Sequence, residues 1–134
     1  ASVGLAQLER LPSFIELKKE FNSTYSKMFL KEEKIKFQRE YENCKSSWWL
    51  NSITVENYSK TIPEIQEFLK SQKISSRRIF IPITEFPPYT KYKKTTYKNA
   101  DHLYKLGLNL PSSTLNSVSA IKEVSEVLLD VFKS

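Results

Sequence analysis

The stretch Arg77–Tyr89, with the sequence RRIFIPITEFPPY, constrains the fold of this chain more than any other. Its apolar run Ile79–Ile81 is typical of a buried strand. Pro82 ends that strand because it has no N–H group for the ladder, and Pro87 and Pro88 impose an extended, exposed path. We therefore expect a buried strand that passes into a stiff loop, where recognition residues are often found. The alternative is a strand followed by a proline-rich connector without a function.

Length and composition indicate one folded domain. The chain has 134 residues, of which 40% are hydrophobic and 27% charged, as in globular proteins. No apolar run approaches the roughly 20 residues that span a bilayer, and Glu9 and Arg10 interrupt the N-terminal apolar pattern, so we expect that this segment is not a signal peptide. The single Cys44 and the single His102 cannot form an internal disulfide or a closed zinc site. We expect a cytoplasmic protein without a membrane partner.

The positive charge of the chain favours an anionic ligand. The net charge is +6, and only four of the 21 basic residues are arginines. Lysines spread along a chain are more typical of a solvated surface than of a nucleic-acid interface, so we expect no nucleic-acid partner, although a phosphate would be attracted. The lysines and tyrosines of Thr90–Asn99 leave one alternative open, a non-enzymatic module that binds nucleic acid or another anion.

Periodicity and capping signals predict the order of the elements. Helical patterns cover residues 2–11 and 13–29, with a break or kink at Pro12. Alternating residues predict antiparallel strands over 35–38 and 48–55. A Thr61–Glu64 capping box begins a helix over 62–72. A further helix over 100–106 is capped by Asn99 and closed by Gly107, and it leads into a strand over 108–110. Ser117 or Ser119 then caps the last helix.

These elements predict an α+β domain, a small and mainly antiparallel sheet with helices packed on one face. Within the strand 48–55, Trp49, Ile53 and Val55 are expected on one face. The apolar helix at the N-terminus has only Ser2 as a weak cap, and we therefore expect it to continue from a longer protein.

The residues show no self-contained catalytic site. Gly4 and Gly107 are too far apart for a phosphate-binding loop, and no serine or cysteine lies in a nucleophile motif. His102 is expected at the surface of its helix. We identify no catalytic residue, no cofactor-binding residue and no metal ligand.

Four segments, in order, resemble the C-terminal part of the PLP-dependent nucleotide-sugar aminotransferases of the DegT/DnrJ/StrS group. These enzymes have fold type I, the aspartate aminotransferase fold. The last segment, ADHLYKLGLNLPSS, is closest to the perosamine-synthase-like members. The four segments are Ala1–Leu11, Ser46–Ile53, Ser76–Tyr89 and Ala100–Ser113.

The resemblance implies that this chain is the small domain of such an enzyme. Residues 1–29 would be the helical segment that leaves the absent large domain, and residues 30–134 would form the small domain, compact together with 13–29. The lysine that forms the Schiff base with PLP lies in the family's large domain, so none of the 17 lysines here would be catalytic. The full-length protein would use PLP, bound mainly by the large domain, to transfer an amino group from glutamate to a nucleotide-linked keto-deoxy-sugar in polysaccharide biosynthesis. It would be a homodimer, and the fragment alone would be inactive.

The resemblance also implies three substrate-binding residues. Arg77 matches the family arginine and Tyr89 the terminal tyrosine of the loop. Thr84 occupies the place where histidine is usual, so it can offer a hydroxyl but not a positive charge. Arg78 stands where the family often has proline. A second reaction stays open, because some relatives are PLP-dependent sugar dehydratases, in which histidine replaces the Schiff-base lysine.

Overall fold

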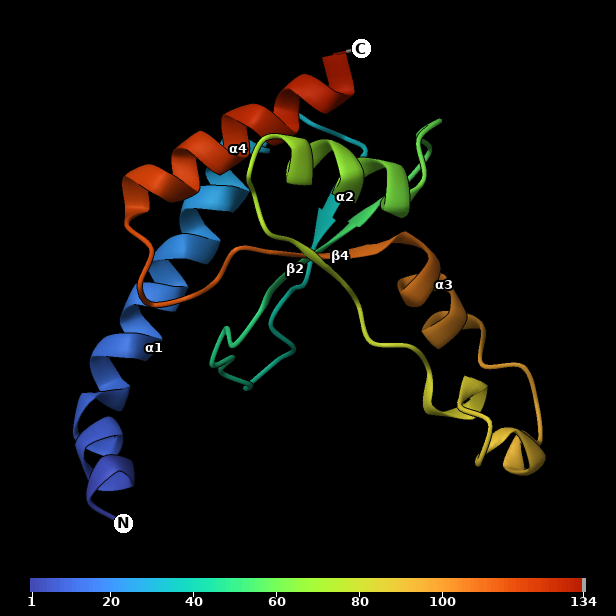
Figure 1. The fold of residues 1–134 in the computed structure, drawn as a ribbon, viewed down its shortest axis with the longest axis horizontal. Coiled ribbons are helices and arrows are strands. Elements are labelled where there is room, and N and C mark those ends of the chain that lie inside the picture. The colour runs from blue at the N-terminus through green and yellow to red at the C-terminus, as the bar shows by residue number, and fades with distance from the viewer. Residues whose placement is uncertain (134) are drawn as a thin grey trace.

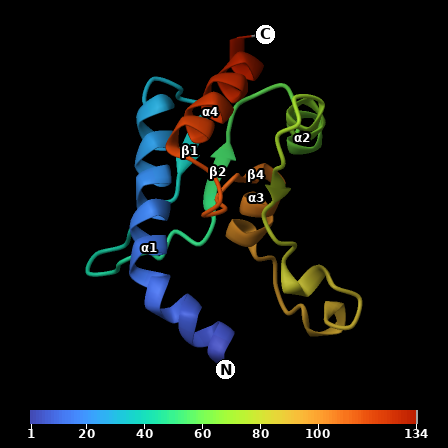
Figure 2. The ribbon, with the colours of Figure 1, turned by 60° about the vertical axis from the view of Figure 1, so that its left-hand side comes forward.

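The computed structural model describes residues 1–133, in which four α-helices surround a four-stranded antiparallel sheet (Figures 1 and 2). The strands lie in the order β1-β2-β4-β3. Their bounds are β1 (Ile35–Phe37), β2 (Asn51–Val55), β3 (Arg77–Arg78) and β4 (Gly107–Leu110). The helices are α1 (Ser2–Met28), α2 (Ile62–Ser71), α3 (Lys98–Leu106) and α4 (Val118–Lys133). Two short 3-10 turns, η1 (Ile83–Glu85) and η2 (Thr90–Tyr92), lie between β3 and α3. The predicted α+β class is confirmed.

One face of the sheet carries the hydrophobic core. Ile53 of β2 and Leu108 of β4 are buried there against side chains of α1, α2 and α4, among them Phe21 and Leu128. These three helices follow the expected packing on one face. Helix α3 lies on the opposite face of the sheet from the core. Its residue Leu103 lines a small cavity with Ser52 and Thr54, and these two residues alternate with the buried, core-facing positions of β2.

Of the break or kink predicted at Pro12, the break is absent, because α1 is one continuous helix, but its N-terminal part bends away from the line of the rest (Figure 2). Proline removes one backbone hydrogen bond, but residues 1–13 are exposed, and a carbonyl that loses its partner there stays accessible to water. The N-terminal half of α1 extends away from the rest of the fold (Figure 1, blue). Its apolar side chains are uncovered, with Val3 75% and Leu8 63% exposed, whereas Phe21 and Tyr25 in the second half are 0% exposed.

The strand predicted over 79–81 lies earlier in the chain. Arg77 and Arg78 pair with Asn109 and Leu108 of β4, and the N–H of Ile79 donates to the carbonyl of Gly107 at 3.3 Å. Before Gly107 the chain is helical, in α3. Strand β4 therefore offers no partner to the residues that follow Ile79, and β3 ends there.

Strand β2 is shorter than predicted, and the expected position of Trp49 is wrong. Trp48 has a left-handed backbone with φ of 49°, which interrupts the alternation of side chains. Trp48 is buried, Trp49 is 66% exposed, and the buried position at the start of β2 belongs to Asn51 instead. The pairing of β1 with β2 is antiparallel, as expected.

The capping predictions were confirmed for two helices. Thr61 and Glu64 form the complete capping box of α2, and the Ser117 hydroxyl accepts the N–H of Ala120 at 3.1 Å at the start of α4. The predicted Asn99 cap is wrong, because α3 begins at Lys98 with Tyr97 as its N-cap.

Gly107 directly follows α3, as expected, but it does not have the left-handed backbone of a typical glycine cap. Its φ and ψ are −93° and 137°, and it is the first residue of β4. A side chain there would collide instead, since a Cβ would lie 2.2 Å from Ile79 Cδ1 and 2.3 Å from the Leu103 carbonyl oxygen. Glycine is required for space, because Ile79 and α3 both press on the start of β4.

None of the helices within residues 1–133 combines the length and apolarity needed to cross a lipid bilayer.

Candidate anion-binding pocket

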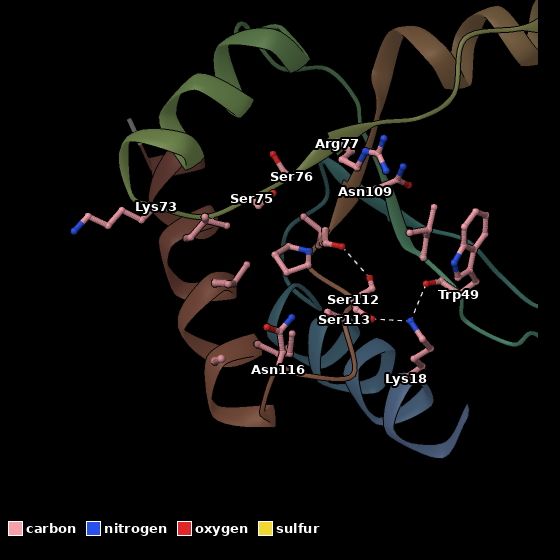
Figure 3. A pocket seen from close by; sticks show the side chains of 17 residues that line it. Lys18, Trp49, Lys73, Ser75, Ser76, Arg77, Asn109, Ser112, Ser113 and Asn116 are labelled. Carbon is pink, nitrogen blue, oxygen red and sulfur yellow. Dashed lines mark hydrogen bonds between the residues drawn. The ribbon is translucent and has the colours of Figure 1, made fainter. Parts of the chain in front are cut away.

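A pocket of about 550 Å³ opens where β3 and β4 meet α1 and the beginning of α4. Figure 3 shows polar side chains from α1, β3, β4 and the loops around it, whereas α4 contributes apolar side chains. Among them are Lys18, Arg77, Asn109, Ser112, Ser113 and Asn116. The pocket is therefore assembled from parts of the chain that are distant in sequence.

Lys18 joins two of these segments. Its Nζ donates to the carbonyl oxygens of Trp49 at 2.9 Å and Ser112 at 2.6 Å. Burial lowers the pKa of the Lys18 ammonium below its ordinary value. The lysine thus ties α1 to the segment before β2 and to the loop after β4, both of which line the pocket.

The loop after β4 is fixed by two further hydrogen-bond donors. Tyr25 donates its hydroxyl to the carbonyl of Pro111 at 3.0 Å, and burial raises the pKa of that phenol, so it stays protonated at neutral pH. The Ser112 hydroxyl accepts the N–H of Asn51 at 2.9 Å and donates to the Leu110 carbonyl at 2.8 Å. These hydrogen bonds therefore fix the backbone of residues 110–112, which line the pocket.

Asn109 links the three strands beside the pocket. Its Oδ1 accepts the Ser52 hydroxyl of β2 at 2.6 Å, and its Nδ2 donates to the Arg78 carbonyl of β3 at 3.2 Å. Asn109 is 5% exposed and directly opposite Arg77 in the strand register. The Asn109 amide therefore holds the short β3 strand in place, and with it the backbone position from which the Arg77 side chain extends.

The charge of the pocket lining is positive. Lys18, Lys73 and Arg77 contribute to it, and none of the lining residues is aspartate or glutamate. In Figure 3 Lys73 points away from the cavity, and Lys18 is already hydrogen-bonded to carbonyls. Arg77 is exposed, and within residues 1–133 its side chain has no hydrogen-bond or ion-pair partner. Its guanidinium is therefore available to an anion such as a phosphate.

The structure separates the three residues expected to bind substrate. Arg77 lines the pocket, but Thr84 in η1 and Tyr89 just before η2 belong to residues 83–97, hereafter the arm. The arm extends away from the sheet (Figure 1, yellow to orange). The Thr84 hydroxyl is buried without a hydrogen-bond partner, and Tyr89 is 47% exposed.

Arg78, the neighbour of Arg77, has a different environment. Its guanidinium lies 4.2 Å from the centre of the Tyr104 ring and donates to the Tyr104 carbonyl at 3.1 Å. This arginine is therefore engaged with α3, and only Arg77 of the pair is free for a ligand.

Several pocket residues could not be assigned from the sequence. The carbonyls that bind Lys18 lie 31 and 94 positions away from it, so no local pattern marks this lysine. Asn109 and Ser112 lie inside the segment whose family resemblance was recognised, and that motif was their only signal. His102, in contrast, is exposed as predicted, with Nε2 3.7 Å from the Glu56 carboxylate.

Comparison with known proteins shows similarity to one enzyme family. The model of the DegT/DnrJ/EryC1/StrS aminotransferase family matches residues 1–129. A GDP-perosamine synthase of Escherichia coli O157:H7 is 31% identical over 113 residues, which are 84% of this chain and 30% of that protein. The chain spans about a third of the length of the curated relatives it matches.

Solved structures show the same fold. Helicobacter pylori PseC, an aminotransferase of pseudaminic acid biosynthesis, superposes with a TM-score of 0.85 at 22% identity, over 97% of this chain and 36% of that one. The E. coli GDP-4-keto-6-deoxy-D-mannose-3-dehydratase with bound hydrated PLP gives a TM-score of 0.76 at 25% identity, over 94% and 33%. The chain is therefore similar both to an aminotransferase and to a dehydratase, two enzymes that catalyse different reactions.

Proposed function

Because this chain belongs to the DegT/DnrJ/EryC1/StrS aminotransferase family, we propose that it is the small domain of a PLP-dependent enzyme acting on nucleotide sugars. The whole protein transfers an amino group from glutamate to a nucleotide-linked keto-deoxy-sugar, as a cytoplasmic homodimer. The observation that carries this proposal is the pocket with the free Arg77 and no carboxylate in its lining. Such a lining suits the diphosphate of a nucleotide sugar.

The cofactor itself does not fit the pocket. Lys18 is the lysine directed toward the cavity (Figure 3), and its amine is occupied by two carbonyls. No acidic residue among the lining residues could pair with a pyridine nitrogen. We therefore assign no residue of this chain to PLP, which supplies the electron sink for amino transfer and is bound mainly by the large domain.

The division of the chain follows from the same proposal. The exposed apolar residues in the first half of α1, among them Val3 and Leu8, belong to the helix that leaves the large domain. The second half packs into the core through Phe21 and Tyr25. In this arrangement Tyr89 of the arm, which is 47% exposed, offers its hydroxyl to the sugar, while Arg77 binds the phosphates. The Thr84 hydroxyl is buried, so its contact with the sugar requires the arm to rearrange.

A PLP-dependent sugar dehydratase is the second candidate. The similarity to the E. coli dehydratase supports it, because this structure covers 94% of the chain at 25% identity. A dehydratase would use the same small domain for the same kind of nucleotide sugar. The two candidates differ in whether nitrogen from glutamate is retained in the sugar product.

Replacing Arg77 by alanine in the whole protein is expected to raise the KM for the nucleotide sugar about tenfold or more. Hydrogen bonds to charged groups contribute about 1.5–3 kcal/mol, and a phosphate contact is made equally before and during the reaction. Such an interaction affects KM and leaves kcat within about threefold. Steady-state kinetics with glutamate and a GDP-linked 4-keto-6-deoxy-sugar measure both constants.

The matched control is Arg39→Ala. Arg39 is an exposed arginine outside the pocket lining, so its removal changes the charge equally and should leave KM unchanged. An unchanged KM in Arg77→Ala would dismiss the role of Arg77. Absence of any amino transfer by the unmodified protein would refute the proposed function itself.

A further inference from the structure

Two exposed aromatic rings lie in contact next to the pocket. The ring centres of Trp49 and Phe80 are 6.3 Å apart, with their planes inclined by 18°. Trp49 is 66% exposed and Phe80 62% exposed, so much of this apolar surface faces solvent. The two residues come from different segments, one before β2 and one after β3, and the fold brings them together.

The backbone on both sides of the ring pair is fixed. The Trp49 carbonyl accepts the Lys18 ammonium at 2.9 Å, and its neighbour Trp48 is buried. On the other side, the N–H of Ile79 binds the Gly107 carbonyl at 3.3 Å, one residue before Phe80. The rings are therefore presented from anchored segments, which lowers the entropic cost of binding a flat ligand.

A free positive charge lies at the same cavity. Trp49 and Arg77 both line the pocket of about 550 Å³, and Figure 3 shows Asn109 between them along one side. Asn109 pairs with Arg77 in the strand register and binds Ser52 in β2. The backbone from which Arg77 extends is thus tied through Asn109 to β2, the strand that directly follows the Trp49 segment.

This combination distinguishes the ring pair from the other exposed apolar surfaces. The arm carries exposed rings, including Tyr92, but no residue of the arm lines the pocket. The first half of α1 carries aliphatic side chains such as Val3 and Leu8, which offer no aromatic face. Only a ligand with both a flat ring and an anionic group uses the indole and the guanidinium together.

We propose that Trp49 and Phe80 form a stacking platform for the base of a nucleoside diphosphate whose phosphates bind Arg77. This inference rests on the proposed function, since it names how the nucleotide part of the substrate is bound. Stacking on an aromatic side chain tolerates every base. The platform therefore contributes affinity for GDP, UDP and dTDP alike, and other contacts select among the bases.

The test measures binding of GDP and of inorganic pyrophosphate to the whole protein by calorimetry. Pyrophosphate carries the charge without the base, so the two ligands separate the platform from the guanidinium. The variants are Trp49→Ala, Trp49→Phe and Arg77→Gln. Tyr92→Ala is the control, because it removes a 61% exposed ring outside the pocket.

Trp49→Ala is expected to raise the Kd for GDP about 5- to 100-fold, the range that corresponds to losing one stacked base. The Kd for pyrophosphate should stay unchanged. Trp49→Phe should retain most of the GDP affinity. Arg77→Gln should weaken the binding of both GDP and pyrophosphate, and Tyr92→Ala should change neither affinity. UDP and dTDP should respond to Trp49→Ala as GDP does.

Three results would overturn the inference. They are an unmodified protein that does not bind GDP, a Trp49→Ala protein that binds GDP normally, and an equal loss for GDP and pyrophosphate. An equal loss would show that Trp49 only supports the fold of the pocket. Because no turnover is measured, GDP binding through Trp49 can hold in a protein without amino transfer, so the inference and the proposed function fail separately.

Discussion

Replacement of Phe21 by alanine is expected to lower the free energy of unfolding of the 134-residue chain by about 3–5 kcal/mol. Phe21 is 0% exposed and belongs to the half of α1 that packs against the core. Removing the ring leaves a cavity between α1 and its neighbours, and the lost contacts are not replaced. Urea denaturation followed by circular dichroism measures the change from the shift in midpoint at constant slope.

Leu8→Ala provides the matched control in the same helix. Leu8 is 63% exposed, and alanine forms helix at least as well as leucine, so the free energy of unfolding should change by less than about 0.5 kcal/mol. This contrast tests the proposed division of α1. Equal losses in the two variants would mean that the first half of α1 is as much a part of this core as the second.

Gly107→Ala is expected to destabilise the chain by about 1–3 kcal/mol or more, the cost of overpacking a tight site. The backbone angles of Gly107 suit any residue, so conformational strain is not the reason. The new Cβ would lie 2.2 Å from Ile79 Cδ1 and 2.3 Å from the Leu103 carbonyl oxygen. The isoleucine could rotate, but the carbonyl belongs to α3 and cannot move without distorting that helix.

Gly4→Ala is the opposite case and serves as the control. A Cβ at Gly4 meets no atom within 4 Å, and the position lies in helix α1. Alanine is favoured over glycine in helices by about 0.8–1.0 kcal/mol, so this variant should be neutral or slightly more stable. Thermal and urea unfolding of the two variants should therefore change in opposite directions. A Gly107→Ala chain as stable as the original would show that α3 does not press on β4.

The sequence predicted those elements whose signals are local. The Thr61–Glu64 capping box defines α2 within four residues, and it was placed correctly. The Ser117 cap and the alternation of the β1 residues are equally local and were also confirmed. These features do not depend on where the rest of the chain lies.

Features that depend on distant partners could not be predicted. The left-handed backbone of Trp48 turns Trp49 outward, and nothing in the neighbouring residues signals it. Part of the steric demand at Gly107 comes from Ile79, which is remote in sequence. The end of β3 is set by the length of β4, and not by its own apolar residues.

The candidate site, too, was predicted only in part from the sequence. Family resemblance led to Arg77, which lines the pocket, but it also led to Thr84 and Tyr89, which lie on the arm. Charge composition predicted an anionic ligand without giving its location. The location depends on Asn109 and Lys18, whose hydrogen bonds join strands and loops far apart in the chain.

The most direct test of the account follows nitrogen from glutamate into the sugar. The whole protein is incubated with PLP, ¹⁵N-glutamate and a GDP-linked 4-keto-6-deoxy-sugar, and the nucleotide sugar is analysed by mass spectrometry. We predict a product in which the keto oxygen has been replaced by a ¹⁵N amino group, with one 2-oxoglutarate formed for each sugar. A sugar that loses a hydroxyl group and carries no ¹⁵N, or one that stays unchanged, would contradict the proposed amino transfer.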